Sequence, residues 1–388
     1  MCLRTTRIIS FLFLSILSGC TSSRIAPYIS STSPDEIIHF IPSDLKDRVG
    51  WAEDIIEGIE KTRRPVTPER VCAVVAVVEQ ESGFQIDPAV RNLPSVIRQG
   101  LKKKFARLGP MAGLAVKAIL EAHAPGNKTS FEKRIARLKT ESDLDRLFRD
   151  IEASVRHRFP GSLVMASLVS KLMGNGWIED LNPVTTAGSM QVKVSYAKEM
   201  DEWKGLSDHE IRDQLYTRKG GVLAGASRLL AYEAKYQDIL YRFADYNSGI
   251  YSSRNAAFQM ALSDVGNRRL VADGDLLSYQ PDGNPKDEIT NSLKSMVEFG
   301  KHHEISDRSI RRAARHEKDE DFESSEIWEK VREVWSKKKG REAPYAQMPN
   351  LTLDSPKLSS KRSTDWFAHS VKRRYDECRR REKKADSQ

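Results

Sequence analysis

The chain has 388 residues, of which 39% are hydrophobic and 30% are charged, and its formal net charge is +9. This length allows one large domain or two ordinary ones, and the composition predicts a hydrophobic core with charged ends. The positive surplus is local, because the segment from Lys357 to the C-terminus carries eleven Lys and Arg residues against five Asp and Glu. A nearly neutral body argues against nucleic acid as a partner. The basic tail is either a solvated segment or a contact for acidic lipid or wall polymer.

The first 20 residues have the pattern of an export signal. Two arginines precede an apolar stretch at 8–17, and Leu17-Ser18-Gly19-Cys20 follows. The apolar stretch is too short for a permanent membrane span. The ending resembles the lipobox of bacterial lipoproteins, which implies that residues 1–19 are a signal peptide and that Cys20 is lipidated. Thr21, where Asp would favour the inner membrane, implies an anchor in the outer membrane facing the periplasm. A buried strand with an incidental cysteine is the alternative.

Residues 20–43 are expected to form a tether, and the stretch 67–84 predicts a buried helix that ends in a carboxylate. Thr67 suits the N-cap, Pro68 suits the first helical position, and residues 71–78 are apolar without interruption. Helical spacing places Glu81 on the same face as three of these valines. Desolvation on an apolar face would raise the pKa of this carboxyl, as a general acid requires. The plainer interpretation is an ion-paired residue in the last helical turn.

The remaining chain shows helical patterns and no convincing alternation of apolar and polar residues, so the predicted fold class is mainly α. Residues 91–173 predict a set of helices, and Ser207 with Glu210 predicts a capping box. One long helix is expected over 221–242. Residues 266–340 predict a charged helical extension. The segment 341–388 predicts a basic, partly disordered tail, in which 365–384 can form an amphipathic helix that touches a membrane or folds back.

The cysteines and histidines indicate neither a disulfide framework nor a metal site. Cys72 falls in the predicted buried helix and Cys378 in the basic tail, and the histidines are scattered. No metal and no cofactor are therefore expected.

Three short motifs occur in order: Glu81-Ser82-Gly83-Phe84, Gly188-Ser189-Met190-Gln191-Val192 and Tyr246-Asn247-Ser248-Gly249. With the Gly-x-x-x-Leu spacing of Gly225 to Leu229, they resemble the soluble-lytic-transglycosylase type of lysozyme-like domain. The resemblance covers residues 67–90 and 182–258. It implies a lysozyme-like catalytic core made of residues 44–90 and 174–265, into which 91–173 is inserted. The whole layout also resembles a family of uncharacterised bacterial lipoproteins, a domain of unknown function.

This resemblance implies a lytic transglycosylase acting on peptidoglycan glycan strands. Protonated Glu81 would donate to the glycosidic oxygen between N-acetylmuramic acid and N-acetylglucosamine, and would then take the proton of the muramoyl C6 hydroxyl. The product is a 1,6-anhydro end, and neither water nor a second carboxylate is needed, unlike in most glycosidases. The implied substrate-binding residues are Ser82, Met190, Gln191, Tyr246 and Asn247.

Two departures from the family pattern leave alternatives open. Glu81 and Gly188 are far apart in sequence, and Thr185-Thr186 stand where the family has Gly-Ala. One alternative is a non-catalytic wall-binding or envelope-assembly lipoprotein on the same fold. The other is a lysozyme-type hydrolase, in which Asp87 or Asp180 would position a water molecule.

Overall fold

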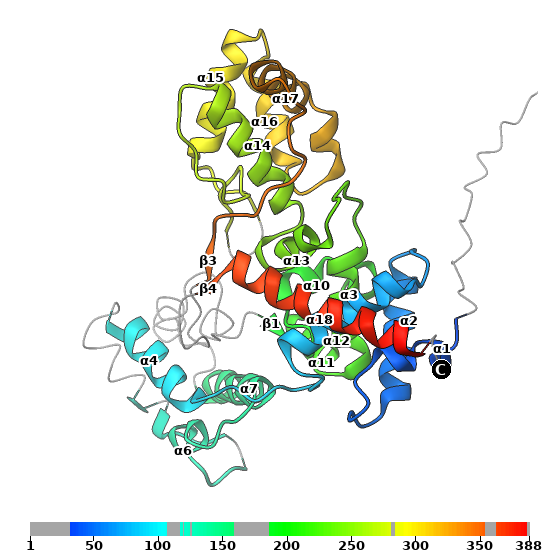
Figure 1. Cartoon of the computed structure of the whole chain (residues 1–388). Helices are drawn as coiled ribbons and strands as arrows, with labels where there is room; N and C mark the ends of the chain where they lie inside the picture. Colours follow the sequence, from blue (N-terminus) through cyan, green and yellow to red (C-terminus); the bar gives the residue numbers. More distant parts are fainter. Residues whose placement is uncertain are drawn as a thin grey trace, which may run out of the picture.

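The computed structural model describes residues 32–106, 117–118, 120–124, 126–158, 186–280, 284–353 and 362–385. The predicted signal peptide, Cys20, Thr185 and Asp180 lie outside these residues. The described chain is mainly helical, which confirms the predicted fold class (Figure 1). No helix within these ranges is long and apolar enough to cross a bilayer.

Strands in the described ranges form two short antiparallel hairpins. In the first, β1 (Thr186–Ala187) pairs with β2 (Val192–Lys193). In the second, β3 (Thr352–Leu353) pairs with β4 (Arg362–Ser363).

A central region is built from helices that share one buried hydrophobic cluster. Its main helices are α2 (Arg48–Lys61), α3 (Pro68–Glu81), α12 (Arg218–Leu230), α13 (Ile239–Ser248) and α18 (Thr364–Ala385). Shorter elements complete it: α1 (Pro34–Ile37), η1 (Ile38–Phe40), α10 (Val194–Lys198), η3 (Asp201–Trp203) and α11 (Asp208–Leu215). The predicted capping box is confirmed at the start of α11, where Ser207 and Glu210 bond each other's backbone N–H.

The predicted helix over 221–242 is wrong in its extent, because the chain forms two helices there. Helix α12 ends at Leu230, and α13 begins after Asp238, whose side chain accepts from Leu240 N at 2.9 Å. Arg242 donates to the carbonyl oxygen of Leu229 at 2.8 Å and so gives a hydrogen-bond partner to one of the free carbonyl groups at the end of α12. The separation of α12 from α13 depends on the polar side chains of Asp238 and Arg242, and the spacing of apolar residues does not reveal it.

The C-terminal segment folds back onto the central region. Helix α18 packs against α3 and α13, and Phe367, Ala368 and Val371 are buried there. The expected helix over 365–384 is therefore confirmed, and of its two expected placements the structure shows the one in which it folds back onto the domain. Basic side chains of α18 also hold it in place: Arg379 pairs with Glu69 of α3 at 2.9 Å, and Arg381 donates to the carbonyl oxygen of Phe40 at 2.9 Å.

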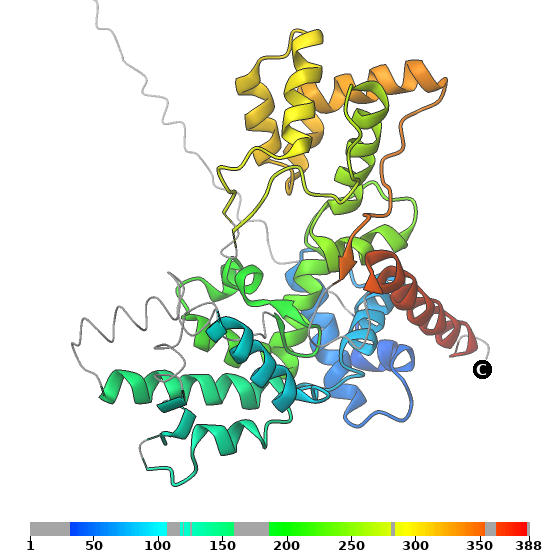
Figure 2. The same ribbon diagram turned by 90° about the vertical axis from the view of Figure 1, so that its left-hand side faces the viewer.

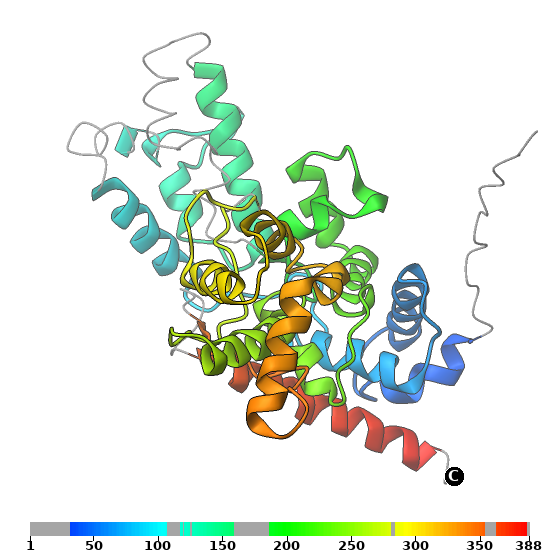
Figure 3. The same ribbon diagram turned by 90° about the horizontal axis from the view of Figure 1, so that it is seen from above.

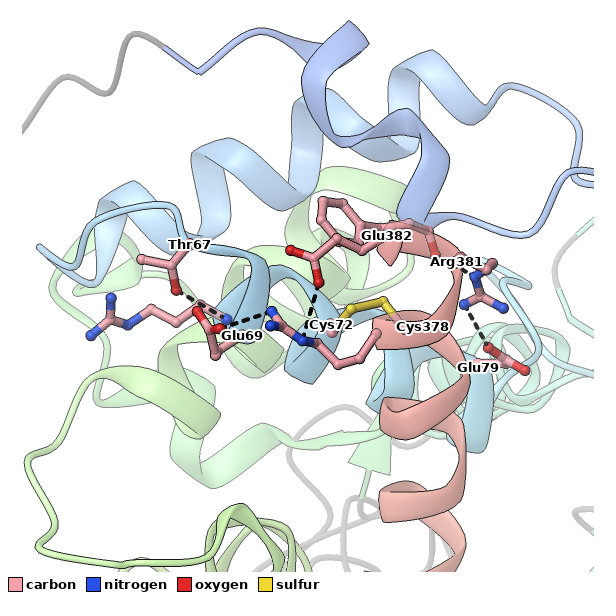
Figure 4. Close-up of a disulfide and its surroundings, with 10 residues drawn as sticks. Thr67, Glu69, Cys72, Glu79, Cys378, Arg381 and Glu382 are labelled. Carbon is pink, nitrogen blue, oxygen red and sulfur yellow. Dashed lines mark hydrogen bonds and ion pairs between the residues drawn. A yellow bond between two sulfur atoms is a disulfide. The ribbon is translucent and has the colours of Figure 1, made fainter. Parts of the chain in front are cut away.

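A disulfide between Cys72 of α3 and Cys378 of α18 corrects the expectation that the chain has none (Figure 4). The two residues are 306 positions apart, with a Cα–Cα distance of 5.5 Å. Sequence spacing does not tell which helix faces meet, so this pairing was not predictable. Disulfides persist in oxidising compartments, which fits an exported chain.

Two further hydrophobic clusters stand apart from the central one. The insertion contributes α4 (Leu93–Ala106), α6 (Phe131–Ile135) and α7 (Glu141–Arg158) around its own small core. A C-terminal lobe contains α14 (Ser252–Val265), α15 (Asn291–His302), α16 (Asp307–Arg315), η4 (Glu320–Ser324) and α17 (Glu326–Lys339). The insertion and the lobe project from the central region in different directions (Figures 2 and 3).

Candidate active site

Glu81 is the last residue of α3, and it is half-buried. The helix starts as predicted, because the Thr67 side chain accepts from Arg70 N at 3.4 Å, and every residue from Val71 to Val78 is buried. Beyond Glu81 the chain turns through Gly83, whose φ of 59° favours glycine. The acid thus stands on the rim of the core, between a rigid helix and a sharp turn.

Ser82 closes the end of α3. Its backbone N–H and its hydroxyl both donate to the carbonyl oxygen of Val78, each at 3.1 Å. The hydroxyl hydrogen is therefore used within the protein, so Ser82 supports the helix end that carries Glu81.

The second motif forms the turn of the β1–β2 hairpin. Gly188 has a φ of 78°, and a Cβ there would lie 2.1 Å from the carbonyl oxygen of Leu215, so only glycine fits. Met190 is fully buried against α12, where a Cβ on Gly225 would lie 2.1 Å from its Sδ atom. Gly225 therefore makes room for Met190, which belongs to the core and not to the wall of a cleft.

Tyr246 joins the hairpin to α13. Its buried hydroxyl donates to the carbonyl oxygen of Met190 at 2.6 Å. Burial raises the pKa of Tyr246 well above its usual value, and the negative charge of Glu81 raises it further. The structure thus brings Glu81, the hairpin and Tyr246 together, although Tyr246 holds the hairpin backbone.

Arg228 of α12 contacts Tyr246 and the neighbouring Tyr196. Its Nε donates to the carbonyl oxygen of Tyr246 at 3.0 Å, and its guanidinium lies 5.5 Å from the ring centres of both Tyr246 and Tyr196. A buried cation between two aromatic rings fixes the end of α13. The motif pattern gave no reason to single out this arginine.

Gln191 connects the hairpin to the insertion. Its amide donates to Glu141 at 3.0 Å and to the carbonyl oxygen of Gly188 at 3.2 Å, and its oxygen accepts from Thr186 at 2.9 Å. Glu141 is buried and is the first residue of α7. Both donors of the amide are therefore directed to the protein itself.

Asn247 makes a similar link to the C-terminal helix. Its amide donates to the hydroxyl of Thr364, the first residue of α18, at 3.4 Å. Asp87, the acid of the hydrolase alternative, accepts from Ser142 N at 3.2 Å and from the Ser142 hydroxyl. It therefore anchors the start of α7.

A fully buried acid also lies in the C-terminal lobe, and the sequence gave no sign of it. The fully buried carboxylate of Glu317 accepts from the backbone N–H of Leu276, from that of Leu277 at 3.3 Å, and from the hydroxyl of Tyr279. Burial raises the pKa of Glu317 to about 7. The three donors surround it completely.

Comparison with known proteins identifies the family. Residues 44–381 match the family described as a protein of unknown function, DUF1615. The chain is also 33% identical over 377 residues to the uncharacterized protein YaiW of Escherichia coli strain K12, covering 95% of this chain and 97% of that protein. No solved structure matches it. The chain therefore belongs to the DUF1615 family, which confirms the predicted membership of an uncharacterised family.

Proposed function

We propose that this member of the DUF1615 family is an outer-membrane-anchored lytic transglycosylase. It cleaves the β-1,4 bond between N-acetylmuramic acid and N-acetylglucosamine and forms a 1,6-anhydro end. One observation carries the proposal: Tyr246 binds the hairpin through Met190 and lies within electrostatic reach of Glu81. Two of the three motifs are thus joined by a hydrogen bond, and Tyr246 brings them within electrostatic reach of the carboxyl of the third.

The chemistry needs one acid that alternates between two protonation states. Protonated Glu81 gives its proton to the bridging oxygen while the bond from that oxygen to C1 breaks. The resulting carboxylate takes the proton of the C6 hydroxyl, and the C6 oxygen bonds to C1. Glu81 ends protonated, so no water is consumed and no other carboxylate is required.

The surroundings of Glu81 suit this role because they fix its position without enclosing it. The valine-rich part of α3 is buried on all sides, and Ser82 closes the helix end. A half-buried carboxyl at such a point keeps access to a ligand. Tyr246 and Arg228 act as positioning residues for the hairpin, because Tyr246 donates to the Met190 carbonyl and Arg228 to the Tyr246 carbonyl.

Anchoring through a lipidated Cys20 completes the proposal. The Cys72–Cys378 disulfide supports a periplasmic location, because such bonds persist outside the reducing cytosol. Several acyl chains on one cysteine would hold the protein stably at the membrane, within reach of the wall.

Digestion of purified peptidoglycan sacculi by the full chain tests the proposal. Mass spectrometry should find soluble fragments with 1,6-anhydro ends. Glu81→Gln keeps the shape but has no acidic proton to donate, so release should fall by at least about 100-fold. Glu79→Gln is the matched control, because Glu79 lies on the same helix but faces Arg381 of α18 at 3.7 Å. Reducing ends in place of anhydro ends would assign a hydrolase instead.

A non-catalytic wall-binding lipoprotein is the second candidate, and one observation favours it. The amides of Gln191 and Asn247 are bonded to Glu141 and Thr364 and so are turned toward the protein. This candidate predicts that the chain binds sacculi without releasing fragments and that Glu81→Gln changes nothing.

A further inference from the structure

A pocket of about 360 Å³ lies in the insertion, formed by α6, by α7 and by the link between them. Two buried leucines form its apolar lining, and six charged residues surround them. The leucines are Leu138 and Leu147; the charged residues are Arg134, Arg137, Arg146, Arg149, Asp143 and Asp150. Four arginines and two aspartates thus line the pocket, and one of the arginines, Arg149, is also ion-paired with Asp145 at 2.5 Å, outside the lining.

The ion pairs within the pocket do not use all the donors of these arginines. Arg134 donates to Asp150 through Nη2 at 2.6 Å, but its Nη1 is buried with no acceptor among the described residues. Arg149 pairs with Asp213 outside the pocket at 2.8 Å, and its Nε is likewise buried without an acceptor. A buried N–H without an acceptor costs about 1–3 kcal/mol, and a rotation of either guanidinium toward the pocket would let a bound oxyanion recover that free energy.

Arginine and leucine together select the chemistry of the ligand. Guanidinium groups bind carboxylates through paired hydrogen bonds. A bare inorganic anion would leave the lining of Leu138 and Leu147 uncovered, whereas an aliphatic chain that ends in a carboxylate would cover it.

We propose that this pocket binds the carboxylates of the peptidoglycan stem peptide. This assignment rests on the proposed function, and it adds a peptide subsite to a glycan-cleaving site. The insertion then serves to recognise strands that still carry their peptides.

The placement of α7 supports this assignment. Its first residue, Glu141, is bonded to Gln191 of the hairpin at 3.0 Å. Because a helix rises 1.5 Å per residue, Arg149 lies about 12 Å farther along the axis. An extended peptide of four residues spans about 13 Å, so a peptide attached to a sugar at the hairpin can reach the pocket.

Isothermal titration calorimetry of the full chain with a free stem tetrapeptide, L-alanyl-γ-D-glutamyl-meso-diaminopimelyl-D-alanine, tests the proposal. We expect saturable binding that is at least about tenfold weaker for the double variant Arg137→Ala/Arg146→Ala, since one lost charged contact is worth about that factor. Both side chains are exposed, so the fold should persist. The matched control is Arg308→Ala/Arg311→Ala, which removes two exposed arginines from α16.

Two further titrations separate peptide recognition from simple charge attraction. The same peptide with its carboxylates amidated should not bind, and inorganic phosphate should bind far more weakly than the peptide. Absence of saturable peptide binding, phosphate binding of equal strength, or an equal loss in the control variant would each overturn the proposal.

Failure of the peptide-binding proposal can be told apart from failure of the catalytic proposal. Glu81→Gln should bind the tetrapeptide as the wild type does. Peptide binding without cleavage of sacculi would overturn catalysis alone, whereas cleavage without peptide binding would overturn the peptide subsite alone.

Discussion

The central region and the C-terminal lobe each place a glutamate in a largely apolar setting, but in opposite ways. Glu81 in the central region is half-buried at the end of α3. Glu317 in the lobe is fully buried, with the hydroxyl of Tyr279 and the backbone N–H groups of Leu276 and Leu277 directed at it. The same residue type is thus an accessible group in one region and an enclosed one in the other.

This difference shows that a perturbed pKa does not by itself identify an active site. Burial raises the pKa of Glu317 to about 7, which would suit an acid catalyst. Yet its donors come from the turn at 276–279, so the carboxyl stabilises that turn and no ligand reaches it. Exposure to solvent and neighbouring motif residues identify an active-site acid better than its pKa does, and Glu81 has both.

The largest expected contrast is in activity on sacculi. Glu81→Gln should lower the rate by at least about 100-fold, because a positioned general acid contributes about 10²–10⁴. Glu317→Gln should leave the rate per folded molecule within about twofold of wild type. Release of soluble fragments, normalised to folded protein by circular dichroism, measures both. A comparable loss in both variants would contradict the assignment of Glu317 as structural.

Loss of the disulfide should destabilise the central region more than the C-terminal lobe. Reduction of the wild type, or Cys72→Ala/Cys378→Ala, should lower the free energy of unfolding of the central region by about 2–5 kcal/mol. The bond closes a long loop across α3 and α18, whereas the described part of the lobe contains no disulfide. Hydrogen exchange should show lost protection in α3 and α18 and unchanged protection in α14 and α17. Equal losses in both regions would mean that they unfold as one unit.

The sequence predicted those features that local patterns determine. Helix α3 follows from Thr67, Pro68 and the run of apolar residues up to Val78, since caps and periodicity act over a few residues. The capping box at Ser207 is of the same kind. The transglycosylase activity, the lipidation of Cys20 and the outer-membrane location stay predictions.

Long-range side-chain partners were not predictable. The Cys72–Cys378 bond, the contact of Gln191 with Glu141 and that of Asn247 with Thr364 each join segments that meet only after the helices pack. A single sequence records the spacing within an element and not the pairing between elements. For this reason both motif amides were assigned to a ligand, although each donates to another side chain of the protein.

The free energy of unfolding should depend on pH through the buried carboxyl of Glu317. Because the pKa of Glu317 rises from 4.5 in the unfolded chain to about 7 in the fold, the native state binds the extra proton between these values. Its contribution to stability is therefore full below pH 4.5 and is lost as the pH rises through 7, by about 3 kcal/mol in total.

Urea unfolding of wild type and Glu317→Gln between pH 4 and 8 measures this loss. The difference in unfolding free energy between the two proteins should change over that window and level off above it. Parallel curves for the two proteins would show that the carboxyl is ionised throughout.

The smallest expected effect concerns the hydrogen bond by which Tyr246 holds the hairpin. Tyr246→Phe removes the hydroxyl that donates to Met190 at 2.6 Å and leaves that carbonyl without this donor, at a cost of about 1–2 kcal/mol. Activity on sacculi should fall about tenfold, because small displacements of a substrate-positioning element have large effects on rate.

The matched control is Tyr196→Phe, which loses a hydrogen bond to Ser227 at 3.1 Å beside the same Arg228 and leaves the bond from Tyr246 to the Met190 carbonyl in place. Its stability should fall by a similar amount while its activity stays unchanged. If both variants lose activity equally, the hydroxyl of Tyr246 acts through general stability, and activity needs no specific support of the hairpin from α13.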